Sequence, residues 1–141
     1  MSIQAILLPL FVEAVLTFGL LFWMAALNAT AVRGGAVRWQ DIALREPNWP
    51  ARNRRIQNAY HNQLELPTLF YILTILAIIT RHADLLFVLL AWVFVVLRCL
   101  QAFVHVTNNY VPRRGALFGV GAAVLAAMWL IVIVRIRLGL G

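Results

Sequence analysis

Apolar residues gather along the chain into four long stretches separated by polar segments. The stretches run from about 3 to 32, 56 to 80, 85 to 106 and 116 to 134. Each reaches the roughly 20 residues that a helix needs to cross a hydrocarbon core of about 30 Å. Backbone polar groups inside lipid must bond within their own segment, so each stretch is predicted to be helical. The pattern therefore predicts an all-α fold, a polytopic membrane protein whose four transmembrane helices form one bundle and one domain over residues 1–141.

Composition supports lipid as the solvent of most of this chain. Hydrophobic residues make up 63% of the sequence and charged residues only 12%, whereas soluble domains are about a quarter charged. A soluble protein of this composition could not cover its surface with polar groups. The first stretch has no basic residue before it and is too long for a signal-peptide core, so we expect it to be retained as a helix.

The connections between the stretches differ in length and composition. The first, over 33–55, is long and polar, and its glycines together with Pro47 and Pro50 argue against a continuous helix there. The second, over 81–84, is predicted to be a tight turn. In the third, Pro112 suits the first turn of the last helix, where its missing N–H costs nothing.

The charge of the chain is strongly basic and unevenly distributed. The net charge is +7, and all 12 basic residues are Arg. A nucleic-acid partner is not expected, because these residues lie in connections between apolar stretches and not on a soluble basic face. Short loops rich in Arg stay in the cytoplasm, and most of these residues are expected only to set this topology. The first and third connections hold eight: Arg33, Arg38, Arg45, Arg52, Arg54, Arg55, Arg113 and Arg114.

The other exposed segments hold only three arginines, namely Arg81, Arg135 and Arg137. Both termini are therefore predicted to lie outside and the long connection inside. In a bacterial cell the protein would reside in the plasma (inner) membrane, with the loops of its active site facing the cytoplasm.

Two of the apolar stretches carry polar side chains at a depth where lipid disfavours them. Such residues usually face a bundle interior and mark a site. In each of the two stretches, the polar residues fall on one stripe of the predicted helix, because successive residues are about 100° apart. Together the two stripes predict a polar cleft open to the cytoplasm. The second stretch contributes Asn58, His61, Asn62 and Glu65, and the third contributes Arg98, Gln101, His105 and Asn109.

The acid and the base of these stripes lie at matched depth. Glu65 and Arg98 are each roughly 12–14 Å from the cytoplasmic ends of their helices at 1.5 Å per residue. A tight turn joins the two helices, so we expect the residues to form a buried ion pair. The pair alone would fit a structural role in fixing helix register as well as a functional one, and the surrounding amides favour function.

Three further residues that could carry chemistry are expected to be structural. Glu13 lies toward the other side of the membrane, outside the cleft. Cys99 neighbours Arg98 in sequence but points about 100° away from it, so it is expected to pack in the interior. His82 is expected to be solvated in the outer turn. The histidines and the cysteine do not cluster at the spacing of metal ligands, so no metal is predicted.

The run from Arg55 to Pro67, with Asn62-x-x-Glu65 followed closely by proline, resembles the second-helix signature of MAPEG, the superfamily of membrane-associated proteins in eicosanoid and glutathione metabolism. The segment from Arg98 to Gly115, with Pro112-Arg113-Arg114, resembles the third helix and the loop after it. The four spans, the long basic first loop and the short second turn extend this similarity over the whole chain.

The resemblance implies a homotrimer, similar to microsomal glutathione transferases, with glutathione as co-substrate bound between adjacent subunits near the cytoplasmic face. It implies that Arg114 lies beside the sulfur and favours the thiolate. Arg33 or Arg38 of a neighbouring subunit would meet a glutathione carboxylate, and Arg98 would support Glu65. Further glutathione contacts would come from Asn58, His61, Asn62, Glu65, Gln101, His105 and Arg113.

The chain departs from the eicosanoid-producing members of the superfamily at three positions. Asn58 and His61 stand where these members often carry Arg, and His105 stands where a Tyr contacts glutathione. Fewer cations predict weaker binding of an anionic tripeptide and argue against a dedicated eicosanoid synthase.

Two functions fit the sequence. The first is a glutathione-dependent transferase or peroxidase that acts on a lipophilic small molecule, an electrophile drawn from the membrane lipid, with an Arg-stabilised thiolate as nucleophile. The alternative is a non-catalytic membrane protein that binds an anionic lipid headgroup or a membrane partner through the same polar stripes and basic loop.

Overall fold

The computed structural model describes residues 1–44 and 48–140, and its regular elements are all helical. No strand occurs in these residues, which confirms the all-α prediction. Arg45 and Pro47, two residues of the predicted polar connection, lie outside the described residues. The elements are α1 (Ile3–Arg33), the short 3-10 helix η1 (Trp39–Asp41), α2 (Ala51–Asn62), α3 (Leu66–Ile79), α4 (Leu85–Val106) and α5 (Val111–Leu138).

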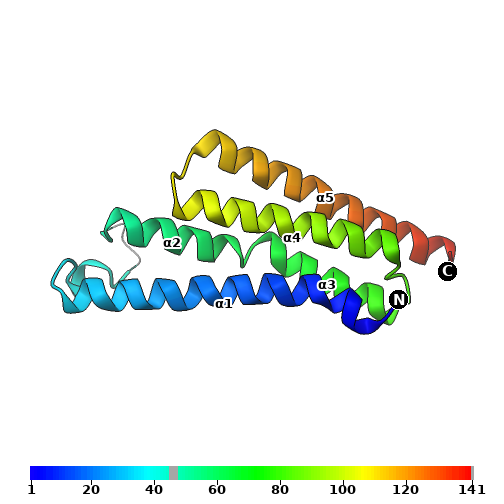
Figure 1. The fold of residues 1–141 in the computed structure, drawn as a ribbon, viewed down its shortest axis with the longest axis horizontal. Coiled ribbons are helices and arrows are strands. Elements are labelled where there is room, and N and C mark those ends of the chain that lie inside the picture. The colour runs from blue at the N-terminus through cyan, green and yellow to red at the C-terminus, as the bar shows by residue number, and fades with distance from the viewer. Residues whose placement is uncertain (45–47, 141) are drawn as a thin grey trace.

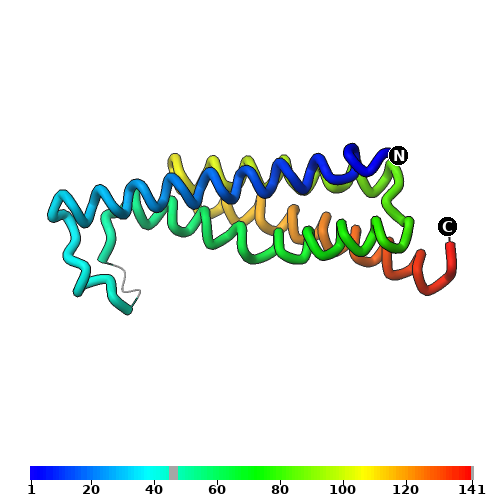
Figure 2. The backbone as a smooth tube through the Cα atoms, turned by 90° about the horizontal axis from the view of Figure 1, so that it is seen from below, coloured from blue at the N-terminus to red at the C-terminus, as the bar shows by residue number. Residues whose placement is uncertain are grey.

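Within the described residues, four helical segments are long and apolar enough to cross a membrane, which makes the chain an integral multi-pass membrane protein. They are α1, α2 together with α3, α4 and α5. Figure 1 shows them side by side as an elongated bundle, with both chain termini at one end. Figure 2 shows the same arrangement from a second direction. The α1–α2 connection and the α4–α5 connection lie at the opposite end, here named the loop end; the other is the terminus end.

The helices begin and end where their sequences favour it. The Ser2 side chain accepts a hydrogen bond from the Ala5 amide at the start of α1, and Asp84 caps α4 in the same way. Pro112 lies in the first turn of α5, as predicted. Gly139 ends α5 at φ 64°, a left-handed conformation that glycine adopts without steric cost.

The second span is not the continuous helix that the sequence predicted, because α2 ends at Asn62 and α3 begins at Leu66. Pro67, in the first turn of α3, is the physical cause. Proline has no N–H to donate, and its ring clashes with the carbonyl four residues earlier. Residues 63–65 turn with tighter i to i−3 bonds instead, and Glu65 has φ −92° and ψ −102°.

The apolar core lies toward the terminus end, between α3, α4 and α5. Phe70 is fully buried, and its ring lies 4.9 Å from that of Phe94, centroid to centroid. Lipid is as apolar as these side chains, so close packing stabilises this region more than water exclusion does. The core consists of Phe70, Leu73, Ala77, Phe87, Ala91, Phe94, Val95, Leu125, Met128 and Val132.

Candidate functional site

A polar pocket of about 350 Å³ opens in the loop-end half of the bundle, between α2, α4 and α5. Its volume falls within the range of small-molecule sites. All four residues of the first predicted stripe line it, and so do Gln101 and His105 of the second, whereas Arg98 and Asn109 do not. The lining residues are Asn58, His61, Asn62, Glu65, Gln101, His105, Arg114, Gly115 and Phe118.

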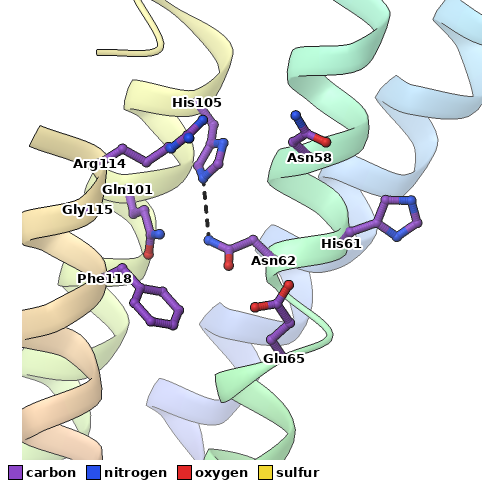
Figure 3. A pocket seen from close by; sticks show the side chains of 9 residues that line it. All are labelled: Asn58, His61, Asn62, Glu65, Gln101, His105, Arg114, Gly115 and Phe118. Atoms are coloured by element: carbon purple, nitrogen blue, oxygen red, sulfur yellow. Dashed lines mark hydrogen bonds between the residues drawn. The ribbon is translucent and has the colours of Figure 1, made fainter. Parts of the chain in front are cut away.

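The wall formed by α2 and the turn after it combines exposed and buried polar groups. Asn58, His61 and Glu65 are exposed, while Asn62 is buried and points toward α4. The Asn62 side-chain nitrogen lies 3.5 Å from Nε2 of His105, the interaction dashed in Figure 3. His61 points away from α4 in the same view. The chain therefore places polar groups on a surface that, for a single copy, would face lipid.

Arg98 is fully buried and does not itself line the pocket. Its Nη1 donates to Oε1 of Gln101 at 2.6 Å, and its Nη2 donates to the Asn62 carbonyl at 2.7 Å. In an unbroken helix the Asn62 carbonyl would accept from residue 66. Here it accepts from the Glu65 amide at 3.4 Å and from Arg98 Nη2. Arg98 thus fixes both a pocket-lining side chain and the end of α2.

The expected ion pair between Glu65 and Arg98 is not formed. Among the described residues the ion pairs join Arg38 to Asp41 and Arg135 to Asp84. The helix break is the reason, because it places a backbone carbonyl where the pairing carboxylate was expected. Glu65 is left exposed at the pocket wall.

Arg114 and Arg113 are separated by the geometry of α5. Arg114 is half-buried and lines the pocket, and its Nη1 donates to Oδ1 of Asn109 at 2.7 Å. Arg113 is exposed and lies 5.8 Å above the Tyr110 ring, outside the pocket lining. Asn109 lies in the loop before α5 and adopts φ 51°, a left-handed conformation in which Asn is enriched.

Sequence reasoning missed two pocket residues, Gly115 and Phe118. Phe118 lies four residues after Arg114, one helical turn further into the membrane, so helical spacing from Arg114 would have found it. Its ring supplies an apolar wall below the arginine (Figure 3).

The two arginines expected from the end of α1 do not line the pocket within this chain. Arg33 and Arg38 are both exposed. Nε of Arg38 lies 3.2 Å from Asp41 Oδ2 across η1. From the resemblance, one of these arginines is expected to contact the ligand from a neighbouring subunit. A single chain does not test that contact.

The other residues singled out for chemistry lie away from the pocket. Cys99 lines a separate, mostly apolar hollow between α1 and α4. His82 is in the α3–α4 turn, where its Nε2 lies 2.6 Å from the Leu140 carbonyl oxygen. The described residues contain no group of three His, Cys, Asp or Glu side chains that could hold a metal ion.

The pocket presents a defined set of charges to a ligand. Glu65 offers a negative charge on one wall, and Arg114 with the N-terminus of α5 offers a positive field on the other. Side-chain amides of Asn58, Asn62 and Gln101 lie between them and can both donate and accept. This arrangement suits a peptide-like molecule that carries both an ammonium group and an anionic group.

Comparison with known proteins agrees with the architecture and the motifs. Searches of curated proteins and of solved structures return no match. The model of the MAPEG family, however, matches residues 6–134, nearly the whole chain. Four apolar spans, a polar pocket at the loop end and this match together establish that the chain belongs to the MAPEG family.

Proposed function

We propose that the protein is a glutathione-dependent transferase or peroxidase that acts on lipophilic electrophiles at the membrane interface. Family membership places it among membrane proteins of glutathione and eicosanoid metabolism. The observation that carries the finer assignment is Arg114, which lines the pocket opposite Glu65. Glutathione has both an ammonium group and a thiol, and these two walls match them in charge.

Glutathione would span the pocket from α2 to α5. Glu65 would bind its ammonium group, and the amides of Asn62 and Gln101 would bind its peptide groups. The remaining predicted contacts, from Asn58, His61 and His105, line the same pocket. Arg113 lies beside it and would attract the anionic tripeptide only at longer range.

Arg114 would stabilise the glutathione thiolate. A free thiol with a pKa near 8.5 is mostly protonated at neutral pH, and a nearby cation favours the thiolate. Arg keeps its proton, so it acts as an electrostatic partner of sulfur and not as a base. The thiolate attacks the electrophilic carbon, the S–C bond forms, and the leaving group departs with the electrons of its bond.

The assembly that completes this site is proposed to be a homotrimer. The exposed polar side chains of Asn58, His61 and Glu65 lie within a membrane-spanning segment, where contact with lipid is costly. A neighbouring copy would cover them and bring Arg33 or Arg38 to a glutathione carboxylate. Native mass spectrometry from detergent should report three chains, and a clean monomer that still binds glutathione would contradict a shared site.

The loop end is proposed to face the cytoplasm, where glutathione is abundant. The arginine count of the connections supports this orientation. An Asn48→Cys variant in a Cys99→Ala background tests it by labelling in intact spheroplasts. Labelling by a membrane-impermeant reagent only after permeabilisation is expected. Labelling from outside would mean the opposite orientation.

A non-catalytic protein that binds an anionic lipid headgroup is the second candidate, because Arg114 and the exposed loop arginines also suit phosphate. Calorimetry of the purified protein with glutathione, followed by a conjugation assay with a hydrophobic aryl halide, separates the two. Saturable binding and thioether formation are expected. Binding of anionic lipid without glutathione binding would favour the alternative.

A further inference from the structure

Asn109 is a polar residue of the second predicted stripe that has no place in the proposed mechanism. It does not line the pocket. Helix α4 ends at Val106, so Asn109 lies beyond the helix, in the loop before α5. Its Oδ1 accepts a hydrogen bond from Nη1 of Arg114 at 2.7 Å. Asn109 therefore contacts the arginine on which the proposed mechanism depends.

The loop holds Asn109 in a defined conformation. Its φ of 51° lies in the left-handed region, where Asn is enriched among residues other than glycine. Its amide donates to the Val104 carbonyl at 2.8 Å, which ties the loop to the last turns of α4. Nη1 of Arg55 donates to the Thr107 carbonyl at 3.1 Å, which links the loop to α2. Two helices thus determine where Asn109 presents its side-chain oxygen.

The neighbouring asparagine of the same loop has a different role. Oδ1 of Asn108 accepts from the Tyr110 backbone amide at 3.1 Å, and so it stabilises the turn itself. Asn108 is exposed, whereas Asn109 is half-buried. Two adjacent residues of one type therefore separate the shape of the loop from the contact with Arg114, and Asn108 provides a matched control.

The acceptor that Asn109 offers is uncharged, which matters for an arginine that must attract an anion. A carboxylate at the same place would bind Arg114 more strongly and cancel much of its charge. Neither of the ion pairs among the described residues includes Arg114. One hydrogen bond occupies one of the five guanidinium N–H groups, and it leaves the others for a ligand.

The other charged and titratable groups around the pocket leave this charge uncompensated. His61 on α2 and His105 on α4 line the pocket and are not acids. Glu65 is the acid among the lining residues, and it forms no ion pair with Arg114. Arg113 lies above the Tyr110 ring, outside the pocket. Arg114 thus meets a neutral acceptor on the loop side and the pocket on the other.

We propose that Asn109 is a positioning residue, which holds the Arg114 guanidinium at the pocket with its positive charge uncompensated. The left-handed backbone places the amide oxygen, and the amide oxygen places the guanidinium. Without this bond the long arginine side chain would gain rotamers that direct its charged end to water at the rim. The consequence for a thiolate rests on the function proposed above.

The thiol pKa of bound glutathione, read from thiolate absorbance over a pH series, tests this role. Asn109→Gly keeps the left-handed backbone and removes the acceptor, so the thiol pKa should rise by about one unit. Asn109→Asp keeps an acceptor but adds a negative charge beside Arg114, so it should raise the thiol pKa at least as far. Asn108→Ala is the control and should keep the parent value.

A ligand without a thiol separates positioning of Arg114 from a general loss of structure. S-methylglutathione cannot ionise at sulfur, so its affinity for Asn109→Gly, measured by calorimetry, should stay within about twofold of the parent. An unchanged thiol pKa in Asn109→Gly would overturn the proposal. A rise of the same size in Asn108→Ala would also overturn it, because the effect would then belong to the loop as a whole.

A double-mutant cycle separates this inference from the proposed function. If the parent binds no glutathione, the proposed function fails, and thermal unfolding in detergent still decides whether Asn109 and Arg114 act as a unit. Asn109→Gly combined with Arg114→Ala should lower Tm by less than the sum of the two single losses, because each change removes the same hydrogen bond. The matched cycle with Arg113→Ala should be additive. Additive losses in both cycles would contradict the positioning role.

Discussion

The two ends of the bundle bury opposite kinds of side chain. Toward the terminus end, α3, α4 and α5 meet through aromatic and aliphatic side chains such as Phe70 and Phe94. Toward the loop end, α2 and α4 meet through Asn62, Arg98 and His105. Helix α4 contributes to both ends: its buried side chains are apolar in the core and polar near the pocket.

The difference separates a half held together by close apolar packing from the half that carries the candidate site. Helices in lipid associate through close packing, so the apolar half needs no specific chemistry. The loop-end half contains a helix break, a buried arginine and exposed polar groups, each of which costs free energy at membrane depth. Arrangements of this kind persist where they serve a site.

The largest effect is expected from Arg98→Leu, which would break the polar half at its centre. The change removes the buried guanidinium that donates to the Asn62 carbonyl and to Gln101. Each lost hydrogen bond to a charged donor costs about 1.5–3 kcal/mol. Thermal unfolding in detergent should show a large decrease in Tm. Glu65→Gln is the control, because Glu65 is exposed and forms no ion pair within the described chain; it should unfold near the parent temperature.

Phe70→Ala is the corresponding change in the apolar half. The side chain is fully buried against Phe94, and its loss leaves a cavity that costs about 3 kcal/mol. Neither Phe70 nor Phe94 lines the pocket, so glutathione affinity measured below the unfolding temperature should stay within about twofold of the parent. Loss of affinity in step with stability would show that the two halves are coupled.

The smallest effect is expected at the terminus-end turn. Asp84 caps α4 and forms an ion pair with Arg135, whose Nη1 lies 2.8 Å from Oδ2. Asp84→Asn keeps the cap and removes the charge, so it should cost about 0.5 kcal/mol, as for exposed pairs. Unfolding at high and low salt measures it. A cost that does not fall with salt would assign the effect to capping instead of charge.

The lengths of the apolar stretches predicted the four spans well, because a helix must be long and apolar enough to cross the hydrocarbon core. The third stretch, 85–106, coincides with α4. The second was wrong at its centre, although Pro67 was visible in the sequence. Prolines are often tolerated in membrane helices, so the residue alone does not say whether a helix kinks or ends.

The polar stripes predicted the pocket, but they did not predict its internal partners. Residues on one face of a helix follow from its periodicity, whereas the partner of a buried charge depends on how neighbouring helices rotate. Glu65 and Arg98 matched in depth, yet the broken helix supplied a backbone carbonyl in place of the carboxylate.

The central claim, that Arg114 stabilises a glutathione thiolate in this pocket, is tested most directly by ultraviolet absorbance. Thiolate absorbs in the near ultraviolet, so titration of the purified protein with glutathione should raise the absorbance. Arg114→Ala should abolish the rise, because this side chain lines the pocket, and Arg113→Ala should keep most of it, because Arg113 lies outside. Parent-like absorbance in both variants would contradict a thiol-activating role for Arg114.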